Sequence, residues 1–348
     1  MQRVYLDHNS TTNLRPEASQ AMLDAMYVLG NPSSVHFEGR IAKSLLENAR
    51  DSLAVSLGCK PASIVFTSGA TEAASIALHA NKVFCSGVEH DAVKTLCIET
   101  LTTLPSGQIL FDDPSTCAVQ LANSETGILQ DLPEDIFLSD VTQAVGKIPF
   151  SYEWLGAKRV IVSAHKFGGP KGVGALVLDN DVKLSPLIVG GGQEMGRRSG
   201  TENIVGAVGM AAAAEAAVLD IERGVWDQVE ELRNILENSI EESFDETIFV
   251  GRGTKRLPNT SLIVHPGWRG ETQVIQLDLS GYAVSAGSAC SSGKVRTSAV
   301  LRSMGYEYEK SSCAMRVSLG PNTTTEEIHG FVEAYCKQGK KVMSRRSA

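Results

Sequence analysis

The sequence predicts an α/β protein with a large domain built on a mostly parallel seven-stranded sheet and a smaller α+β domain. Between residues 64 and 178, short apolar runs rich in β-branched residues alternate with helical periodicities, which is typical of a parallel sheet covered on both faces. After two long helical patterns over residues 202–243, the chain changes to short strands and helices. The length of 348 residues and the 43% hydrophobic content allow two packed cores.

The elements follow from periodicity and from their start and stop residues. Helices are predicted at residues 16–29, with Pro16 at the start, and at 39–57, with Gly58 as the stop. Strands are predicted at 64–67, 82–85, 108–111, 117–121, 136–139, 159–163 and 174–178, with helices beginning near Thr71 and His90. The C-terminal part is predicted to hold strands at 247–250, 260–264, 283–285 and 315–319, and helices at 271–279, at 297–304 and from 325. The Gly- and basic-rich stretch near residue 250 suggests a boundary between a large domain of residues 13–250 and a small domain of residues 1–12 plus 251–348.

Composition excludes several classes of function. The net charge of −8 argues against nucleic acid as a partner. The seven cysteines include no CxxC pair, so neither a disulfide framework nor a metal site is indicated. The first residues read as a strand rather than a signal peptide. The apolar stretch 204–219 contains Glu215 and predicts a packed helix rather than a membrane span. A cytoplasmic protein is expected.

Two predicted strands end in side chains that can hold a cofactor. The strand at 159–163 is followed by Ala-His165-Lys166, and the strand before it ends in Asp140-Val-Thr-Gln143. Neighbouring parallel strands end at one edge of a sheet, so Lys166 and Asp140 are expected to lie close together. Pyridoxal phosphate (PLP) needs such a pair, an amine for a Schiff base and a carboxylate that keeps the pyridine nitrogen protonated. The alternative is that Asp140 caps a helix through Gln143.

The segment Thr67-Ser-Gly-Ala70-Thr71-Glu places a glycine turn between a strand and a helix. Backbone amides and the hydroxyl of Thr71 at a helix N-terminus make an anion site. An ordinary threonine cap is an equally good reading. His90 follows the next strand and can stack on a flat ring and carry protons, with a capping or core role as the alternative.

Two loops rich in small residues complete the pattern. The loop from Gly190 ends in Arg197-Arg198-Ser-Gly-Thr201, which suits a phosphate or a subunit interface; the alternative is a plain surface loop. Ser285-Ala-Gly-Ser-Ala-Cys290-Ser-Ser-Gly surrounds a cysteine with small residues only. A structural cysteine is normally packed among apolar side chains, so Cys290 is predicted to be an exposed nucleophile.

A series of motifs thus follows in order along the chain. They are Tyr5-Leu-Asp-His-Asn-Ser-Thr-Thr, Gly30-Asn31-Pro-Ser-Ser, Phe66-Thr-Ser-Gly-Ala-Thr-Glu, Glu89-His90, Asp140-Val-Thr-Gln, Ser163-Ala-His-Lys, Arg198-Ser-Gly-Thr and Gly287-Ser-Ala-Cys. Together they resemble the cysteine desulfurases, which belong to the class V aminotransferases among the fold-type I PLP enzymes. The resemblance extends over essentially the whole chain. The stretch between Cys290 and Arg316 is similar to the branch with a long cysteine-bearing loop.

The resemblance implies a role for each motif. Lys166 carries the Schiff base, His90 stacks on the ring and moves protons, and Cys290 takes the sulfur. The other implied site residues are, for the cofactor, Ala70, Thr71, Asn123, Ser124, Asp140, Gln143, Ser163, His165 and Thr201, the last reaching the partner subunit's phosphate, and, for the substrate, Arg316 and Asn31. Relatives usually have Asn-Asn-Glu where this chain has Asn123-Ser124-Glu125, so either Asn123 or Ser124 is expected to contact the cofactor oxygen.

The function implied by the resemblance is a PLP-dependent cysteine desulfurase. It converts L-cysteine to L-alanine and holds the sulfur on Cys290 as a persulfide for iron–sulfur cluster or other sulfur-cofactor assembly. The implied partners are L-cysteine, a second copy of the chain and a sulfur-acceptor protein such as a cluster scaffold. Selenocysteine lyase and class V aminotransferase are the enzymatic alternatives. A non-catalytic sulfur-carrier subunit is the alternative of a different class.

Overall fold

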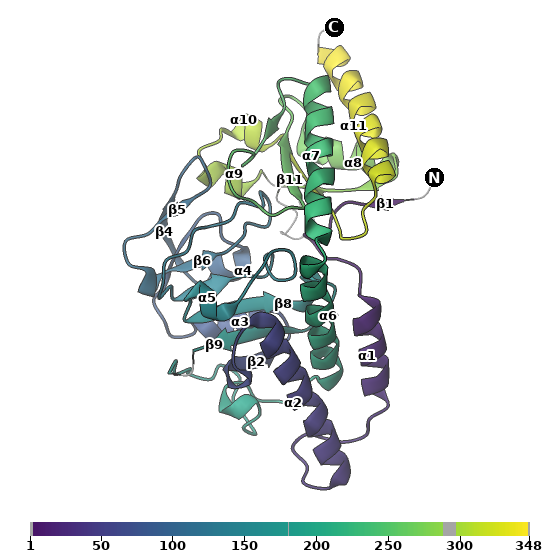
Figure 1. The fold of residues 1–348 in the computed structure, drawn as a ribbon. Coiled ribbons are helices and arrows are strands. Elements are labelled where there is room, and N and C mark those ends of the chain that lie inside the picture. Colours follow the sequence, from purple (N-terminus) through teal and green to yellow (C-terminus); the bar gives the residue numbers. More distant parts are fainter. Residues whose placement is uncertain (1–2, 180, 288–296, 347–348) are drawn as a thin grey trace.

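A mixed β-sheet forms the centre of the larger half of the molecule (Figure 1). The computed structural model describes residues 3–179, 181–287 and 297–346. The sheet has the strand order β2 (Ile64–Thr67), β9 (Gly174–Leu178), β8 (Arg159–Ser163), β7 (Leu138–Asp140) and β6 (Ala118–Gln120). Strands β6, β7 and β8 run parallel, and β9 runs antiparallel to both β8 and β2. The parallel strands therefore end together, with Asp140 at the end of β7.

A second, three-stranded sheet extends the first. It comprises β3 (Phe84–Ser86), β4 (Ile98–Thr103) and β5 (Ile109–Leu110), and an isolated parallel bridge between Phe84 and Cys117 joins it to the edge of the central sheet. Every strand predicted between residues 64 and 178 is present, but they divide between two sheets, and β4 is an additional strand. The helix predicted near His90 is only the single turn α4 (Asp91–Lys94), because the β-branched residues of β4 favour an extended chain.

Helices cover the central sheet (Figure 1). Helix α3 (Ala70–Leu78) follows β2, and the short α5 (Tyr152–Leu155) precedes β8. Helix α6 (Ile204–Glu222) packs against both α1 (Pro16–Met26) and α2 (Phe37–Leu57). Among the described residues, α6 is the one helix long and apolar enough to cross a membrane, and half of it is buried inside the protein. Its Ala- and Gly-rich surface lets α1 and α2 approach closely.

The smaller half is built on an antiparallel sheet. Its strand order is β10 (Ile248–Phe249), β11 (Thr260–Val264), β14 (Ala314–Ser318) and β13 (Ser285–Ala286), and its helices are α7 (Val225–Ser243), α8 (Gly270–Leu279), α9 (Ala299–Ser303), α10 (Tyr308–Ser311) and α11 (Thr325–Arg346). Trp268, Phe331 and Tyr335 are fully buried in its core. Helix α7 and β10 precede residue 250, yet their apolar side chains belong to this second core.

The N-terminal segment crosses to the smaller half. Strand β1 (Val4–Tyr5) pairs in parallel with β12 (Tyr282–Ala283), and Asp7 forms a bridge with Ser318 at the end of β14. The chain then continues to Asn9 and Ser10, whose backbone carbonyls contact Lys166. Residues from both ends of the sequence thus lie against the strand ends of the central sheet.

Candidate active site

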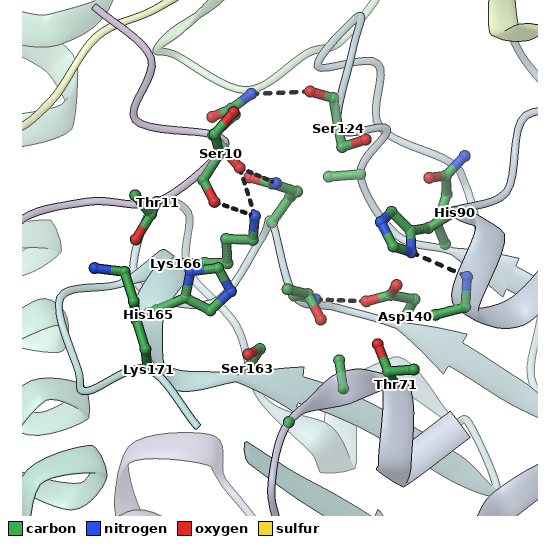
Figure 2. A pocket seen from close by; sticks show the side chains of 18 of the residues that line it. Ser10, Thr11, Thr71, His90, Ser124, Asp140, Ser163, His165, Lys166 and Lys171 are labelled. Carbon is green, nitrogen blue, oxygen red and sulfur yellow. Dashed lines mark hydrogen bonds between the residues drawn. The ribbon is translucent and has the colours of Figure 1, made fainter. Parts of the chain in front are cut away.

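A cavity of about 630 Å³ lies at the ends of β7 and β8, beside the start of α3 (Figure 2). Most residues that the sequence predicted for a site line this one cavity. They are Ala70, Thr71, His90, Ser124, Asp140, Gln143, Ser163, His165, Lys166 and Arg316. The volume falls in the range of cofactor and small-molecule sites in proteins.

The lysine and the carboxylate face the cavity from neighbouring strands. Asp140 is the last residue of β7, and Lys166 ends a short 3-10 turn that follows β8. The Lys166 Nζ donates hydrogen bonds of 2.7 Å to the carbonyl oxygens of Asn9 and Ser10. One oxygen of Asp140 accepts from the Thr142 backbone amide at 2.9 Å, which fixes the carboxylate (Figure 2).

The start of α3 forms an anion-binding wall. Its N-cap, Gly69, provides no side-chain cap, so the first amides of the helix are available to a ligand. At Gly174 an added Cβ would lie 2.7 Å from the Cα of Gly69, so only glycine lets β9 pass the turn this closely. The hydroxyls of Thr71 and Ser163 line the same wall (Figure 2).

The negative charge of Glu72, in the first turn of α3, is balanced by the guanidinium of Arg198. Glu72 accepts hydrogen bonds from the Ser68 amide and from the Arg198 guanidinium, each at 2.8 Å. Burial acts to raise the pKa of Glu72, but the hydrogen bonds from Arg198 and Ser68 outweigh it and lower that pKa below its usual value. The wall therefore keeps its positive character, to which Lys171 at the cavity rim contributes.

His165 adds a neutral imidazole to this wall. Burial, followed by the charges of Lys166 and Lys171, lowers the pKa of His165 to about 4. The ring is therefore neutral at pH 7. Its Nδ1 is buried, and the described part of the chain offers it no hydrogen-bond partner. A buried polar atom of this kind is usually satisfied by a ligand or a water molecule.

His90 approaches the cavity from another side. It caps α4, and its Nδ1 accepts a hydrogen bond of 3.1 Å from the Ala92 amide. Because Nδ1 is the acceptor, the neutral ring carries its proton on Nε2. The fixed backbone contact sets the orientation of the ring beside Asp140 (Figure 2).

Arg316 forms the wall contributed by the smaller half. Its guanidinium on β14 donates to Asp7 Oδ1 and Ser10 Oγ at 2.7 Å and to the Ser124 carbonyl at 2.9 Å. The Arg316 Nε is buried and has no partner among the described residues. The side chain is thus held rigidly beside the cavity. A planar guanidinium in this position is suited to a carboxylate.

The structure separates the roles of Asn123 and Ser124. The Asn123 side chain serves its own turn: its Oδ1 accepts from the amides of Glu125 and Thr126, and its Nδ2 donates to the Val88 carbonyl. Asn123 does not line the cavity, whereas Ser124 does. Ser124 is therefore the residue of this pair that a ligand can contact.

Asn31 and Thr201 lie elsewhere. Both are exposed, and neither lines the cavity. The Asn31 Oδ1 accepts from the Ser33 amide at 2.9 Å, as in an ordinary Asn turn. Within one copy of the chain, these two residues are not part of the site.

Cys290 lies outside the described residues, but the flanks of its segment are defined. On one side β13 pairs with β14 so that Ser285 stands opposite Arg316. On the other side, the Ser298 hydroxyl donates to a carboxylate oxygen of Glu125 at 2.6 Å. Burial raises the pKa of Glu125 to about 7. Both flanks thus adjoin the cavity wall formed by Arg316 and the turn at Ser124.

A buried polar network behind Lys166 was missed by the sequence analysis. The backbone carbonyl of Asn9 accepts a hydrogen bond from the side-chain Nε2 of Gln143. The side-chain Oδ1 of Asn9 accepts a second hydrogen bond from Lys147 Nζ at 3.0 Å. Lys147 also donates to Gln143 Oε1 at 2.6 Å. Burial, followed by the charges of Lys166 and Arg316, lowers the pKa of Lys147 well below its usual value. The Gln143 amide is therefore committed to this network as well as to the cavity.

Comparisons with known proteins show the family to which this chain belongs. The family model of class-V aminotransferases matches residues 4–96 and 87–331, and the chain belongs to this family. Cysteine desulfurase IscS of Dictyoglomus turgidum is 36% identical over 94% of this chain and 92% of its own length. A cysteine desulfurase of Cereibacter sphaeroides is 39% identical over 96% of this chain and 95% of its own.

Two solved structures of NifS-like proteins share the fold of this chain. The NifS-like protein from Rickettsia africae superposes with a TM-score of 0.88 at 29% identity, covering 98% of this chain and 100% of that one. A second NifS-like protein has a TM-score of 0.87 at 31% identity, covering 97% of this chain and 99% of that one. The predicted fold class is therefore confirmed.

Proposed function

We propose that this protein is a PLP-dependent cysteine desulfurase that converts L-cysteine to L-alanine and carries the sulfur as a persulfide. The observation that carries the proposal is the arrangement of Lys166, Asp140 and Arg316 around one cavity that is closed on a further side by the start of α3. Relatives named cysteine desulfurase support the choice of substrate.

The donor set fits PLP. The first amides of α3, with Thr71, Ser163 and neutral His165, would hold the phosphate. Asp140 would pair with the pyridine nitrogen, and Lys166 Nζ would bond to the aldehyde carbon. The buried His165 Nδ1 has no hydrogen-bond partner in the described part of the chain, and a phosphate oxygen would supply one, which supports this assignment. His90 would lie over the ring.

The chemistry divides between the cofactor and the chain. When bound, PLP supplies an electron sink for the charge left at the substrate α-carbon. Arg316 binds the substrate carboxylate and so fixes its orientation. The Lys166 amine removes the α-proton, and His90, with a proton on Nε2, acts in the later transfers. The Cys290 thiolate takes the sulfur from the substrate, and a proton replaces it at the β-carbon to give L-alanine.

The setting of the protein belongs to the proposal. Cys59, Cys85, Cys97, Cys117, Cys313 and Cys336 are free thiols, which suits the reducing cytoplasm. The sequence predicts a small domain of residues 1–12 and 251–348, but α7 and β10 pack in the same core. We therefore place the small domain at residues 1–12 and 225–348, with Cys290 between β13 and α9. A sulfur-acceptor protein, such as a scaffold for iron–sulfur clusters, would receive the persulfide sulfur.

A product assay tests the function. Purified protein supplied with PLP and L-cysteine should release L-alanine and, with a thiol reductant, sulfide in equal amounts. The 2-oxo acid 3-mercaptopyruvate without alanine, with the amino group left on the cofactor, would instead indicate an aminotransferase reaction. Alanine from L-selenocysteine but not from L-cysteine would indicate a selenocysteine lyase. If PLP-loaded protein releases no alanine, no sulfide and no 2-oxo acid, a non-catalytic sulfur-carrier role would be favoured.

Ser124→Asn is expected to tighten PLP binding about two- to tenfold. Ser124 lines the cavity with a shorter side chain than the asparagine usual in relatives, and an asparagine there would add one hydrogen bond worth about 0.5–1.5 kcal/mol. Equilibrium dialysis of PLP measures the change. Asn123→Ser is not the equivalent change, because it breaks the turn that Asn123 caps. Unchanged or weaker binding in Ser124→Asn would mean that another group already fills the role.

We propose that the active form is a homodimer. A group of large apolar side chains is exposed around the end of α1 and the start of α2, and it includes Tyr27 (88% exposed), Leu29 (80%), Val35 (88%) and Phe37 (64%). An exposed apolar group of this size usually marks an interface. Asn31 lies within this segment, and Thr201 is also exposed. We propose that both residues reach the partner subunit's site.

Val35→Glu combined with Phe37→Glu should convert the dimer to a monomer, because charges at the centre of an apolar interface are costly. Sedimentation velocity measures the state. The matched control is Leu279→Glu on α8, an equally apolar side chain that is 82% exposed outside the segment, and it should stay dimeric. An active monomer in the unmodified protein would refute the proposal.

A further inference from the structure

Two thiols flank the segment that carries His90. Cys85 lies on β3 and Cys97 immediately precedes β4, and the two strands pair in parallel with Cys85 opposite Glu99. Side chains alternate between the faces of a strand. Cys97, two positions before Glu99, therefore lies on the same face as Cys85. His90 and α4 occupy the loop between the two cysteines.

The two thiols differ in access but interact directly. Cys85 is fully buried, whereas Cys97 is partly exposed between the exposed side chains of Leu96 and Ile98. Each thiol is the largest influence on the other: their hydrogen bond lowers the pKa of Cys97 and raises the pKa of Cys85. Cys97 is thus the thiol that ionises at the lower pH and contacts solvent, whereas Cys85 is buried and ionises less readily.

The remaining nearby cysteine points elsewhere. Cys117 pairs with Phe84, so it lies on the face opposite Cys85. Its Sγ donates to the Asp113 carbonyl at 3.1 Å. Cys117 is therefore a built-in control for any chemistry of the Cys85–Cys97 pair.

We propose that Cys85 and Cys97 form a redox-active dithiol that closes an intramolecular disulfide around the His90 segment when a small disulfide such as oxidised glutathione is present. The Cys97 thiolate attacks one sulfur of glutathione disulfide and expels one glutathione thiolate. The Cys85 thiol then loses its proton and attacks the Cys97 sulfur, which expels the second glutathione. Two protein thiols are oxidised, and one small disulfide is reduced to two thiols. His90 and Ala92 lie between the two cysteines in the chain and line the cavity. The disulfide therefore constrains one wall of the site when the thiols are oxidised.

Mass spectrometry of the PLP-loaded protein tests this proposal without an activity assay. The Cys290→Ser background removes the predicted reactive thiol of the 285–293 loop, leaving the other cysteines in place. After treatment with oxidised glutathione and alkylation, trypsin should yield residues 83–94 joined to residues 95–147. Dithiothreitol should separate the two peptides. The joined peptide should persist in Cys117→Ser and vanish in Cys85→Ser and in Cys97→Ser.

Two results would overturn the proposal. One is a stable glutathione adduct on Cys97 with Cys85 still alkylated, which would show that the buried thiol cannot attack. The other is a joined peptide that is lost in Cys117→Ser, which would assign the link to Cys117. Thermal unfolding of the untreated variants confirms that each is folded, so loss of the link cannot be attributed to a damaged sheet.

Discussion

Lys166→Ala is expected to lose turnover and to bind PLP without the visible absorption band of a lysine Schiff base. The Lys166 Nζ is the amine on the short turn that follows β8, held by the carbonyls of Asn9 and Ser10 at 2.7 Å. Loss of a positioned acid–base group alone costs about 10²- to 10⁴-fold in rate, and loss of the covalent anchor adds to it. Absorbance spectra and alanine release measure the two effects.

Lys171→Ala is the matched control for this prediction. Lys171 lines the same cavity but lies at its exposed rim. Its loss should weaken binding of the phosphate while leaving the absorption band and measurable turnover. A Lys166→Ala protein that kept the band would show that another amine holds the cofactor, and the assignment of the site would be wrong.

The sequence predicted the centre of the site because local patterns position it. A β-branched run that stops at Ser163 must end a strand, and the apolar run Ile136-Phe-Leu that stops before Asp140 ends another. Adjacent strands in a parallel sheet then bring the following residues together. The glycine turn before α3 was predictable for a similar reason, since Gly69 and Gly174 permit a close backbone approach.

The network of Asn9 and Lys147 was not predictable in this way. These residues are 138 positions apart, and no local periodicity reports on such a contact. Their positions depend on the N-terminal segment returning from β1 to the strand ends of the large sheet. A buried lysine at position 147 reads in the sequence as an ordinary surface residue; only packing reveals it.

Strand β4 was missed for a different reason. Its residues Ile98–Thr103 are mostly exposed, so they lack the continuous apolar run that identified the buried strands. Strand β4 is the middle strand of the sheet β3-β4-β5, so pairing with two neighbours rather than burial decides its conformation. Cys97 directly precedes this unpredicted strand, which is why no pattern in the sequence paired it with Cys85.

Cys290→Ser is expected to bind L-cysteine with the usual spectral change but to form no persulfide and almost no L-alanine. The argument rests on two separate nucleophiles. The Lys166 side acts on the α-carbon and needs no thiol, whereas removal of sulfur needs a soft nucleophile that accepts it. A thiol is about a few per cent ionised at pH 7, while a serine hydroxyl ionises far less.

The control is Cys313→Ser, which should remain active. Cys313 is 4% exposed and packs in the main hydrophobic core, so it cannot travel to the cavity. Alanine release from L-cysteine and from L-selenocysteine should be measured side by side for both variants. Selenium can leave without a protein thiol. Activity of Cys290→Ser on selenocysteine alone would therefore support separate roles for Lys166 at the α-carbon and Cys290 at the sulfur. Near-normal alanine from L-cysteine would remove Cys290 from the mechanism, because the sulfur would then need a different acceptor.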